Sequence, residues 1–393
     1  MEFDALISPL DRTTFAARYW EKTCLHQKGV AGRFAGLMNW DGLNELLENH
    51  RLQPEHLKLV REGSVIPPEK FFRTMPGAGN IARIESGCVT ALLASGASLL
   101  LESVGELSSA VRALSRSVCS ALKCRNGGAS LYASWHAVKG FGPHWHPHGV
   151  LALQLAGRKR WQIHAPTEGY PIEGDMPPPP VGAPVLGITL EDGDLLYLPR
   201  GWWHAVSPFS RPSLHLSLSL KPATGADLLH WAVEQVKEET LARQTVPLLD
   251  DDAAQAAHLG RLRDLLSQAL SGDALSDFAG HLAAPVRGRP PMRLLRGPYD
   301  QLGPLRDDSR IRLAATNVLK LERRGEKVQF QAYGKTYSVP AFVAPALARL
   351  SDTKGMTVAE LIAALGDSKA AAELLPGLAL LARAGVVLVE NPE

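Results

Sequence analysis

Cysteine is scarce in this sequence. The 393 residues contain four cysteines, Cys24, Cys88, Cys119 and Cys124, and no two of them form a C-x-x-C pair. A chain of this length has ample apolar material for a core, so a disulfide framework is not needed to stabilise it. We therefore expect four reduced, buried thiols.

Strong net charge and long apolar runs are also absent. The formal net charge is +2, which creates no overall field that would favour nucleic acid or an anionic membrane. No uncharged segment approaches the ~20 apolar residues that a membrane span needs. The opening MEFDALISPLDRTTF lacks the basic and then apolar order of a signal peptide. We expect a cytoplasmic protein without a membrane or nucleic-acid partner.

The pattern of apolar residues changes along the chain. Leucine and valine recur at helical spacing over 105–124, and Asn126–Gly128 is predicted to end that helix. Residues 129–220 hold short apolar runs separated by Gly and Pro, which is typical of an antiparallel sandwich or barrel. Residues 221–285 are again helical, GRPP at 288–291 is a predicted linker, and strands followed by helices occupy the remainder. The sequence therefore predicts an α+β protein of two or three domains.

Three histidines alternate with other residues just before an apolar run. His144, His146 and His148 occur in FGPHWHPHGVLALQLAG, and alternate side chains of an extended strand share one face. A fourth, His204, follows DGDLLYLPRGWW. Because imidazole is a common ligand of Fe, Zn, Cu and Ni, we predict a metal site of His144, His146 and His204. His148 is either a competing ligand or a neighbour of the ligands.

Other residues near these motifs have weaker signals. Lys159 lies at the far end of the strand after His144, where it would bind the distal carboxylate of a small diacid that chelates the metal. A solvated basic turn is the alternative, because Arg158 and Arg160 flank it. Three tryptophans are candidates for the pocket wall, although tryptophans such as Trp202 and Trp203 more often lie in the core or at a rim. The remaining histidines near the motifs are expected not to be ligands. The tryptophans are Trp145, Trp202 and Trp203; the histidines are His136, His164 and His215.

In combination, these motifs resemble those of the JmjC oxygenases of the cupin fold, and among them the ribosomal oxygenases. Family members read approximately G-x-G-P-H-x-D, then an apolar strand that ends in G-[KR]-[KR]-x-W, and later G-D-x-L-Y-x-P-x-G-x-x-H. This chain reads GFGPHWH, GRKRW and GDLLYLPRGWWH. Its RYWEKTCLHQKG also resembles the family's opening F-W-E-K-x-P-L. The likeness extends over nearly the whole chain.

The resemblance implies an architecture and an assembly. Residues 1–220 would form a double-stranded β-helix, the jelly roll of JmjC-type cupins, with N-terminal helices. Residues 221–288 would be a helical dimerisation domain, and residues 292–393 a winged-helix-like domain. A homodimer is therefore expected, with a protein or peptide as substrate.

The resemblance also implies a chemistry. Fe(II) would be held by His144, His146 and His204, and 2-oxoglutarate would be the co-substrate of a side-chain hydroxylation. Lys159 matches the family's basic residue that binds the 2-oxoglutarate carboxylate. Positions near the co-substrate match Tyr132 and Ser134, and more weakly Ser217.

One ligand departs from the family pattern, because the usual aspartate is His146 in this chain. A neutral imidazole in place of an anion leaves one more unit of positive charge at an Fe(II) site. Two alternatives therefore remain open: a three-histidine metal oxygenase that acts without 2-oxoglutarate, and a catalytically silent metal-binding cupin scaffold. Stoichiometric succinate production separates the expected enzyme from both.

Overall fold

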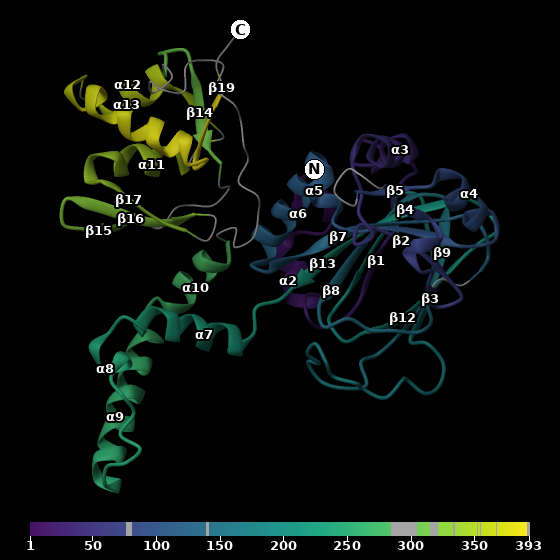
Figure 1. The fold of residues 1–393 in the computed structure, drawn as a ribbon, viewed down its shortest axis with the longest axis horizontal. Coiled ribbons are helices and arrows are strands. Elements are labelled where there is room, and N and C mark those ends of the chain that lie inside the picture. Colours follow the sequence, from purple (N-terminus) through teal and green to yellow (C-terminus); the bar gives the residue numbers. More distant parts are fainter. Residues whose placement is uncertain are drawn as a thin grey trace. The chain divides into compact units, whose positions relative to one another are not determined.

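A computed structural model describes most of the chain in two compact units, Met1–Pro222 and Ala223–Glu393. The described residues are 1–75, 81–138, 141–283, 305–314, 321–332, 335–351, 353, 355–366 and 368–390. The predicted linker at 288–291 lies outside them. Figure 1 shows each unit as a mixture of helices and strands, so the predicted α+β class is confirmed.

The helices of the first unit lie mainly before the central strands. They are α1 (Phe3–Ile7), α2 (Arg12–Arg18), α3 (Trp40–Asn49), α4 (Ser86–Ala94), α5 (Val104–Leu107) and α6 (Ser109–Leu122). Ser108 caps α6 and four apolar residues of one face are buried, as the helical spacing predicts. The predicted end at Asn126–Gly128 is wrong. Lys123 ends the helix in the left-handed conformation, and strand β7 (Arg125–Ser134) follows.

Two antiparallel sheets form the body of the first unit. The larger has the order β1-β11-β8-β13-β7-β6-β2-β3, and the smaller has the order β10-β9-β12. The bounds of the large sheet's other strands are β1 (Leu25–Gln27), β2 (Leu57–Arg61), β3 (Ser64–Val65), β6 (Ser98–Leu101), β8 (Gly149–Ala156), β11 (Leu195–Leu198) and β13 (Ser213–Lys221). Those of the small sheet are β9 (Arg158–His164), β10 (Leu186–Glu191) and β12 (Trp203–Pro208). A separate hairpin pairs β4 (Phe72–Met75) with β5 (Ile81–Ile84).

Strand β13 has one apolar and one polar face. Its four leucines, Leu214, Leu216, Leu218 and Leu220, belong to the main hydrophobic core. The alternate residues His215, Ser217 and Ser219 line a cavity instead. The strict alternation of this strand thus separates the stabilising core from the polar side of the first unit.

A tight turn joins β8 to β9 and sets the position of the basic cluster. Gly157 has a φ of 64°, and a Cβ at this position would collide with the carbonyl oxygen of Pro212. Beyond the turn, the β9 side chains alternate between buried and exposed positions, and Lys159 and Trp161 are buried. The glycine therefore allows the register that turns Lys159 inward.

The second unit begins with helices and continues with small sheets and further helices. Its helices are α7 (Gly225–Val236), α8 (Thr240–Arg243), α9 (Asp252–Ala269), α10 (Ala274–Ala283), α11 (Ala344–Ser351), α12 (Val358–Leu365) and α13 (Ser368–Arg383). One sheet joins β18 (Met356–Thr357), β14 (Arg310–Leu313) and β19 (Val387–Glu390), and another joins β15 (Glu322–Arg324), β16 (Lys327–Ala332) and β17 (Lys335–Pro340). Among the described residues, no helix combines the length and the apolar character needed to cross a membrane.

Candidate functional site

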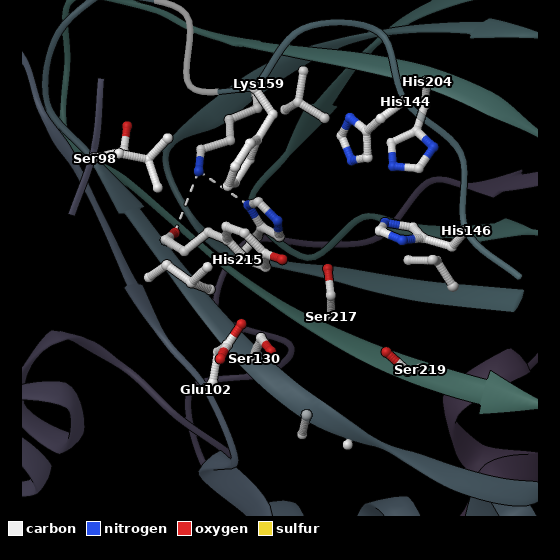
Figure 2. A pocket seen from close by; sticks show the side chains of 18 of the residues that line it. Ser98, Glu102, Ser130, His144, His146, Lys159, His204, His215, Ser217 and Ser219 are labelled. Carbon is white, nitrogen blue, oxygen red and sulfur yellow. Dashed lines mark hydrogen bonds between the residues drawn. The ribbon is translucent and has the colours of Figure 1, made fainter. Parts of the chain in front are cut away.

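A cavity of about 490 Å³ lies in the first unit beside the polar face of β13. It brings together the predicted metal ligands and the predicted co-substrate residues, and Figure 2 shows histidines at one end and Lys159 at the other. The singled-out residues that line it are Tyr132, Ser134, His144, His146, His148, Lys159, His204 and Ser217. Their roles remain predictions, but their proximity is a property of the fold.

Three imidazoles converge at the histidine end. One ring nitrogen from each of His144, His146 and His204 lies within 4.8 Å of the other two. The ring centroids of His144 and His204 are 4.3 Å apart, and that of His146 is 5.0 Å and 5.2 Å from them. This spacing and the donor type fit one transition-metal ion with three protein ligands and open positions for other molecules.

Backbone pairing holds two of these histidines opposite each other. The amide of His144 donates to the carbonyl of His204 at 3.0 Å, and the amide of His204 donates back at 2.8 Å. Gly201 N donates to the carbonyl of His146 at 3.0 Å. The PRGWW turn is therefore connected directly to the other histidine segment, which explains how residues so far apart in sequence share one site.

Ring hydrogen bonds orient the same two imidazoles. Nδ1 of His144 lies 2.8 Å from the carbonyl of Gly142, and Nδ1 of His204 lies 3.2 Å from that of Trp202. Because a carbonyl only accepts, each Nδ1 carries the hydrogen and each Nε2 keeps a free lone pair. Such backbone acceptors are a usual means of fixing the tautomer of a metal-binding histidine.

Burial keeps these rings neutral. It lowers the pKa of His144, and burial together with His144 and His146 lowers the pKa of His204 well below its usual range. Burial, and then His144 and His148, lower the pKa of His146 to about 3. Neutral imidazole is the form that binds a metal, so the site needs no deprotonation at physiological pH.

His148 is beside the triad and not within it. Its ring stacks on that of His146 with centroids 4.9 Å apart and an interplanar angle of 8°. Its Nδ1 lies 3.1 Å from the carbonyl of Gly149. The stacking supports the orientation of His146, so the geometry favours the role of a neighbour over that of a competing ligand.

Lys159 is buried at the opposite end of the cavity, with 2% of its surface exposed. Its Nζ donates to the carbonyl of Tyr132 at 3.3 Å and lies 3.0 Å from Nδ1 of His215. Burial lowers its pKa to about 7. Among the described residues no carboxylate forms an ion pair with it, and a solvated basic turn is excluded. A buried ammonium of this kind favours an anionic ligand.

The predicted co-substrate neighbours also line the cavity. The Tyr132 ring stacks on His215, and burial and Glu102 raise the pKa of Tyr132 to about 12, so the phenol stays protonated. Ser134 Oγ hydrogen bonds with Ser98 Oγ at 2.9 Å. Ser217 projects into the cavity from β13. These hydroxyl groups make the Lys159 end polar.

The prediction for the tryptophans is wrong. Trp161 lines the cavity, whereas Trp145, Trp202 and Trp203 are not among its lining residues. Trp203 is buried elsewhere and its Nε1 donates to Thr167 Oγ1 at 3.1 Å. Trp203 directly precedes His204 in β12, and adjacent residues of a strand point to opposite faces.

His215 was expected to be a histidine without a ligand role, and its place in the cavity was missed. It is buried, contacts Lys159 and lies in the polar row of β13. The signal was present in the sequence, since PSLHLSLSL alternates strictly and places His215, Ser217 and Ser219 opposite the leucines.

Residues 106–228, which contain the cavity's histidines and Lys159, match the model of the JmjC domain family. Over these residues the chain resembles the JmjC domain. The predicted family is confirmed, and the double sheet with its converging histidines is a JmjC fold of the cupin type.

Curated relatives of this chain have one recurring description. The bifunctional lysine-specific demethylase and histidyl-hydroxylase NO66 of Drosophila persimilis is 28% identical over 260 residues, which are 62% of this chain and 35% of that protein. NO66 of Dictyostelium discoideum is 37% identical over 125 residues, 29% of this chain and 24% of that protein. The chain thus spans about a third or less of the length of these relatives.

Among solved structures, this chain resembles the ribosomal oxygenase YcfD of Escherichia coli. The structure of YcfD in complex with cobalt and 2-oxoglutarate has a TM-score of 0.60 and 21% sequence identity, and the match covers 98% of this chain and 99% of that one. A second YcfD structure, with cobalt and succinic acid, has a TM-score of 0.58 at 20% identity. At this identity the likeness establishes the fold.

Proposed function

We propose that this protein is an Fe(II)- and 2-oxoglutarate-dependent oxygenase that hydroxylates a side chain of a protein or peptide. One observation carries the proposal: three neutral imidazoles and a buried lysine without a carboxylate partner among the described residues lie in one cavity. The imidazoles suit a divalent metal, and the lysine suits an acid. The cobalt and 2-oxoglutarate of the YcfD structure support the same pair of ligands.

In this proposal His144, His146 and His204 hold the iron. Bound iron would supply the activation of O2 and the oxidation of the C–H bond. The protein holds His144 and His204 with Nε2 free by giving each Nδ1–H to a carbonyl. Trp161 stacks beside His204 with centroids 5.7 Å apart, and excludes water from that side of the site.

Lys159, Tyr132 and Ser134 form the proposed co-substrate site. The ammonium of Lys159 binds the carboxylate distant from the metal, and the protonated phenol of Tyr132 is a further donor. Ser217, on the neighbouring strand β13, is a weaker candidate for this site. The protein thereby orients the diacid, so that its other end is directed at the histidines.

The substrate is proposed to be a protein, and a ribosomal protein in particular. The printed names of the relatives support this class: NO66 is a histidyl-hydroxylase and YcfD a ribosomal oxygenase. The target residue is not assigned by these names, since the chain covers a limited part of the curated relatives.

A second candidate function follows from His146. A third neutral ligand in place of the family's aspartate favours a three-histidine oxygenase that acts without 2-oxoglutarate. A silent metal-binding scaffold would keep the same residues. O2 consumption without succinate production would identify the three-histidine oxygenase. Metal binding without O2 consumption or succinate production would identify the silent scaffold.

An anaerobic titration tests the proposal. The apo-protein is loaded with Fe(II) and then with 2-oxoglutarate, and the metal-to-ligand charge-transfer absorbance is followed in the native protein and in His146→Asp. We expect a saturable band in both, and stoichiometric succinate when O2 and substrate are added. A band in His146→Asp alone would show that the third histidine prevents use of the co-substrate.

The finer architecture is also a proposal. Residues 221–288 would dimerise and 292–393 would form a winged helix, in a cytoplasmic protein. Exposed apolar side chains on α7 and α9 support the dimer: the exposed fractions of Leu229, Val233 and Leu259 are 50%, 47% and 63%. A monomeric mass by light scattering would exclude the homodimer, and Leu229→Glu should dissociate it.

A further inference from the structure

The N-terminal motif RYWEKTCLHQKG packs against the PRGWW turn that precedes His204. Glu21 Oε2 lies 3.4 Å from Nη2 of Arg200, which is in the turn between β11 and β12. The amide of Glu21 donates to Tyr197 Oη at 3.1 Å, and the Trp20 ring stacks on that of Tyr197 with centroids 5.8 Å apart. Two consecutive residues of the motif thus contact both the end of β11 and the turn that follows it.

The ion pair of Glu21 and Arg200 is largely buried and incompletely hydrogen bonded. The exposed fractions of the two side chains are 19% and 11%. Within the described part of the chain, Glu21 Oε1 and Arg200 Nε are buried without a hydrogen-bond partner. Burial raises the pKa of Glu21, and Arg200 opposes this rise. Because desolvation offsets most of the attraction between two buried charges, this pair contributes little to the stability of the fold.

The backbone of Glu21 has the same implication. Its φ is 55°, in the left-handed region that favours glycine. A glycine would adopt this conformation at a lower cost, so local backbone preference does not explain a glutamate here. The carboxylate of this residue is therefore the group that needs an explanation. Specifying one arrangement of the segments that it joins is a known use of a buried ion pair.

The turn next to Arg200 contacts two of the proposed metal ligands. The amide of Gly201 donates to the carbonyl of His146 at 3.0 Å. The carbonyl of Trp202 accepts the Nδ1–H of His204 at 3.2 Å. A shift of the turn therefore changes the backbone contact of one ligand and the ring orientation of another.

We infer that the Glu21–Arg200 ion pair positions His146 and His204 for the metal by fixing the PRGWW turn. Neither side chain is among the described residues that line the cavity, so both act through the turn as positioning residues. Groups outside the ligand shell commonly set metal affinity in this way. The inference rests on the metal site of the proposed function and is independent of 2-oxoglutarate.

The test separates positioning from stability. Glu21→Leu/Arg200→Met replaces both charges with apolar side chains, and Glu21→Gln removes the charge of one partner. Glu191→Gln is the matched control, since Glu191 forms an exposed ion pair with Lys28 that also joins the N-terminal segment to the strands. Three quantities are measured in each protein: Co(II) affinity by isothermal titration calorimetry, the visible absorption of bound Co(II), and the unfolding temperature of the apo-protein.

We expect the double variant to unfold at the native temperature or above it, because both buried charges have been removed. Its Co(II) affinity should nevertheless fall about tenfold, and the visible absorption of bound Co(II) should change with the ligand geometry. Glu21→Gln leaves the Arg200 charge buried alone, so it should lower both the unfolding temperature and the Co(II) affinity. Glu191→Gln should match the native protein in all three measurements. If one of the Glu21 variants does not fold, the other decides.

Two outcomes would overturn the inference. The first is native Co(II) affinity and a native spectrum in the folded variants. The second is a native spectrum with a Co(II) loss that only follows the unfolded fraction, which would mean that the pair stabilises the fold and does not position ligands. Failure of the proposed function gives different results. Native protein that binds Co(II) but not 2-oxoglutarate would refute the proposed oxygenase alone, and native protein that binds no Co(II) would refute the metal site and this inference together.

Discussion

The two ends of the cavity bury basic nitrogens in different ways. At the histidine end, desolvation keeps His144, His146 and His204 neutral, and two Nδ1–H groups are used by backbone carbonyls. At the other end Lys159 is more deeply buried than these histidines, and burial lowers its pKa to about 7. The first end presents lone pairs and the second presents hydrogens.

This difference shows why one cavity can bind two unlike ligands, a metal cation and a diacid. A set of neutral lone pairs is completed by a cation, and a set of unmatched donors is completed by an anion. A chelating diacid links the two, because one molecule meets the metal and the lysine together. Each end is therefore tested by substituting one of its own residues. The ligand affinity of the other end is measured as a control.

The largest expected effect is the loss of metal binding. His204→Ala removes one of three metal ligands, and we expect Co(II) affinity to fall by more than about 100-fold. Loss of a group that only hydrogen bonds to a metal ligand already lowers metal affinity by about 10- to 100-fold. Isothermal titration calorimetry measures this affinity. His136→Ala is the matched control, because His136 is exposed and outside the triad. Equal affinity in both variants would refute the metal site.

Lys159→Met tests the other end. We expect 2-oxoglutarate affinity to fall by about 30-fold or more, because losing one member of a buried charge pair costs about 2–5 kcal/mol. Metal affinity should be unchanged. The free energy of unfolding of the unliganded variant should rise by ~2 kcal/mol, since a buried unpaired charge has been removed. Arg160→Met, an exposed neighbour, is the control. Unchanged 2-oxoglutarate affinity in Lys159→Met would contradict the assignment.

The pH dependence of 2-oxoglutarate binding is a smaller effect. The pKa of Lys159 is about 7 in the free protein, and the bound carboxylate requires the ammonium. Binding above this pH therefore takes up one proton, and affinity should fall about tenfold per unit from about pH 7.5 to 9. Charge-transfer titrations at several pH values measure this slope. A flat profile would mean that Lys159 stays charged throughout.

The smallest expected effect is at the histidine end over the same pH range. The pKa values of His144, His146 and His204 are lowered, so these rings are already neutral. Co(II) affinity should vary by less than about threefold from pH 7 to 8.5, since no ligand proton is displaced. A steep rise of affinity with pH would show that the triad holds a proton and that the two ends do not differ.

Local pattern was sufficient for much of the fold. The helical spacing before Leu122 predicted α6, and the short apolar runs of residues 129–220 predicted the antiparallel sheets. The secondary structure of residues next to turns was harder to predict. Asn126–Gly128 looks like a helix end, but belongs to a ten-residue strand, because pairing with β13 outweighs the local preference of Asn and Gly.

The site also has features that the sequence predicted and features that depend on the tertiary structure. The sequence by itself determined most of the side chains that are suited to the chemistry, namely the alternating histidines and a lysine after a glycine turn. Only the tertiary structure decided which of them meet. The pairing of His144 with His204 closes the metal triad, and the packing of β9 against β13 brings Lys159 to His215. Such contacts depend on sheet register and burial, which join residues distant in sequence, and local pattern carries no information about them.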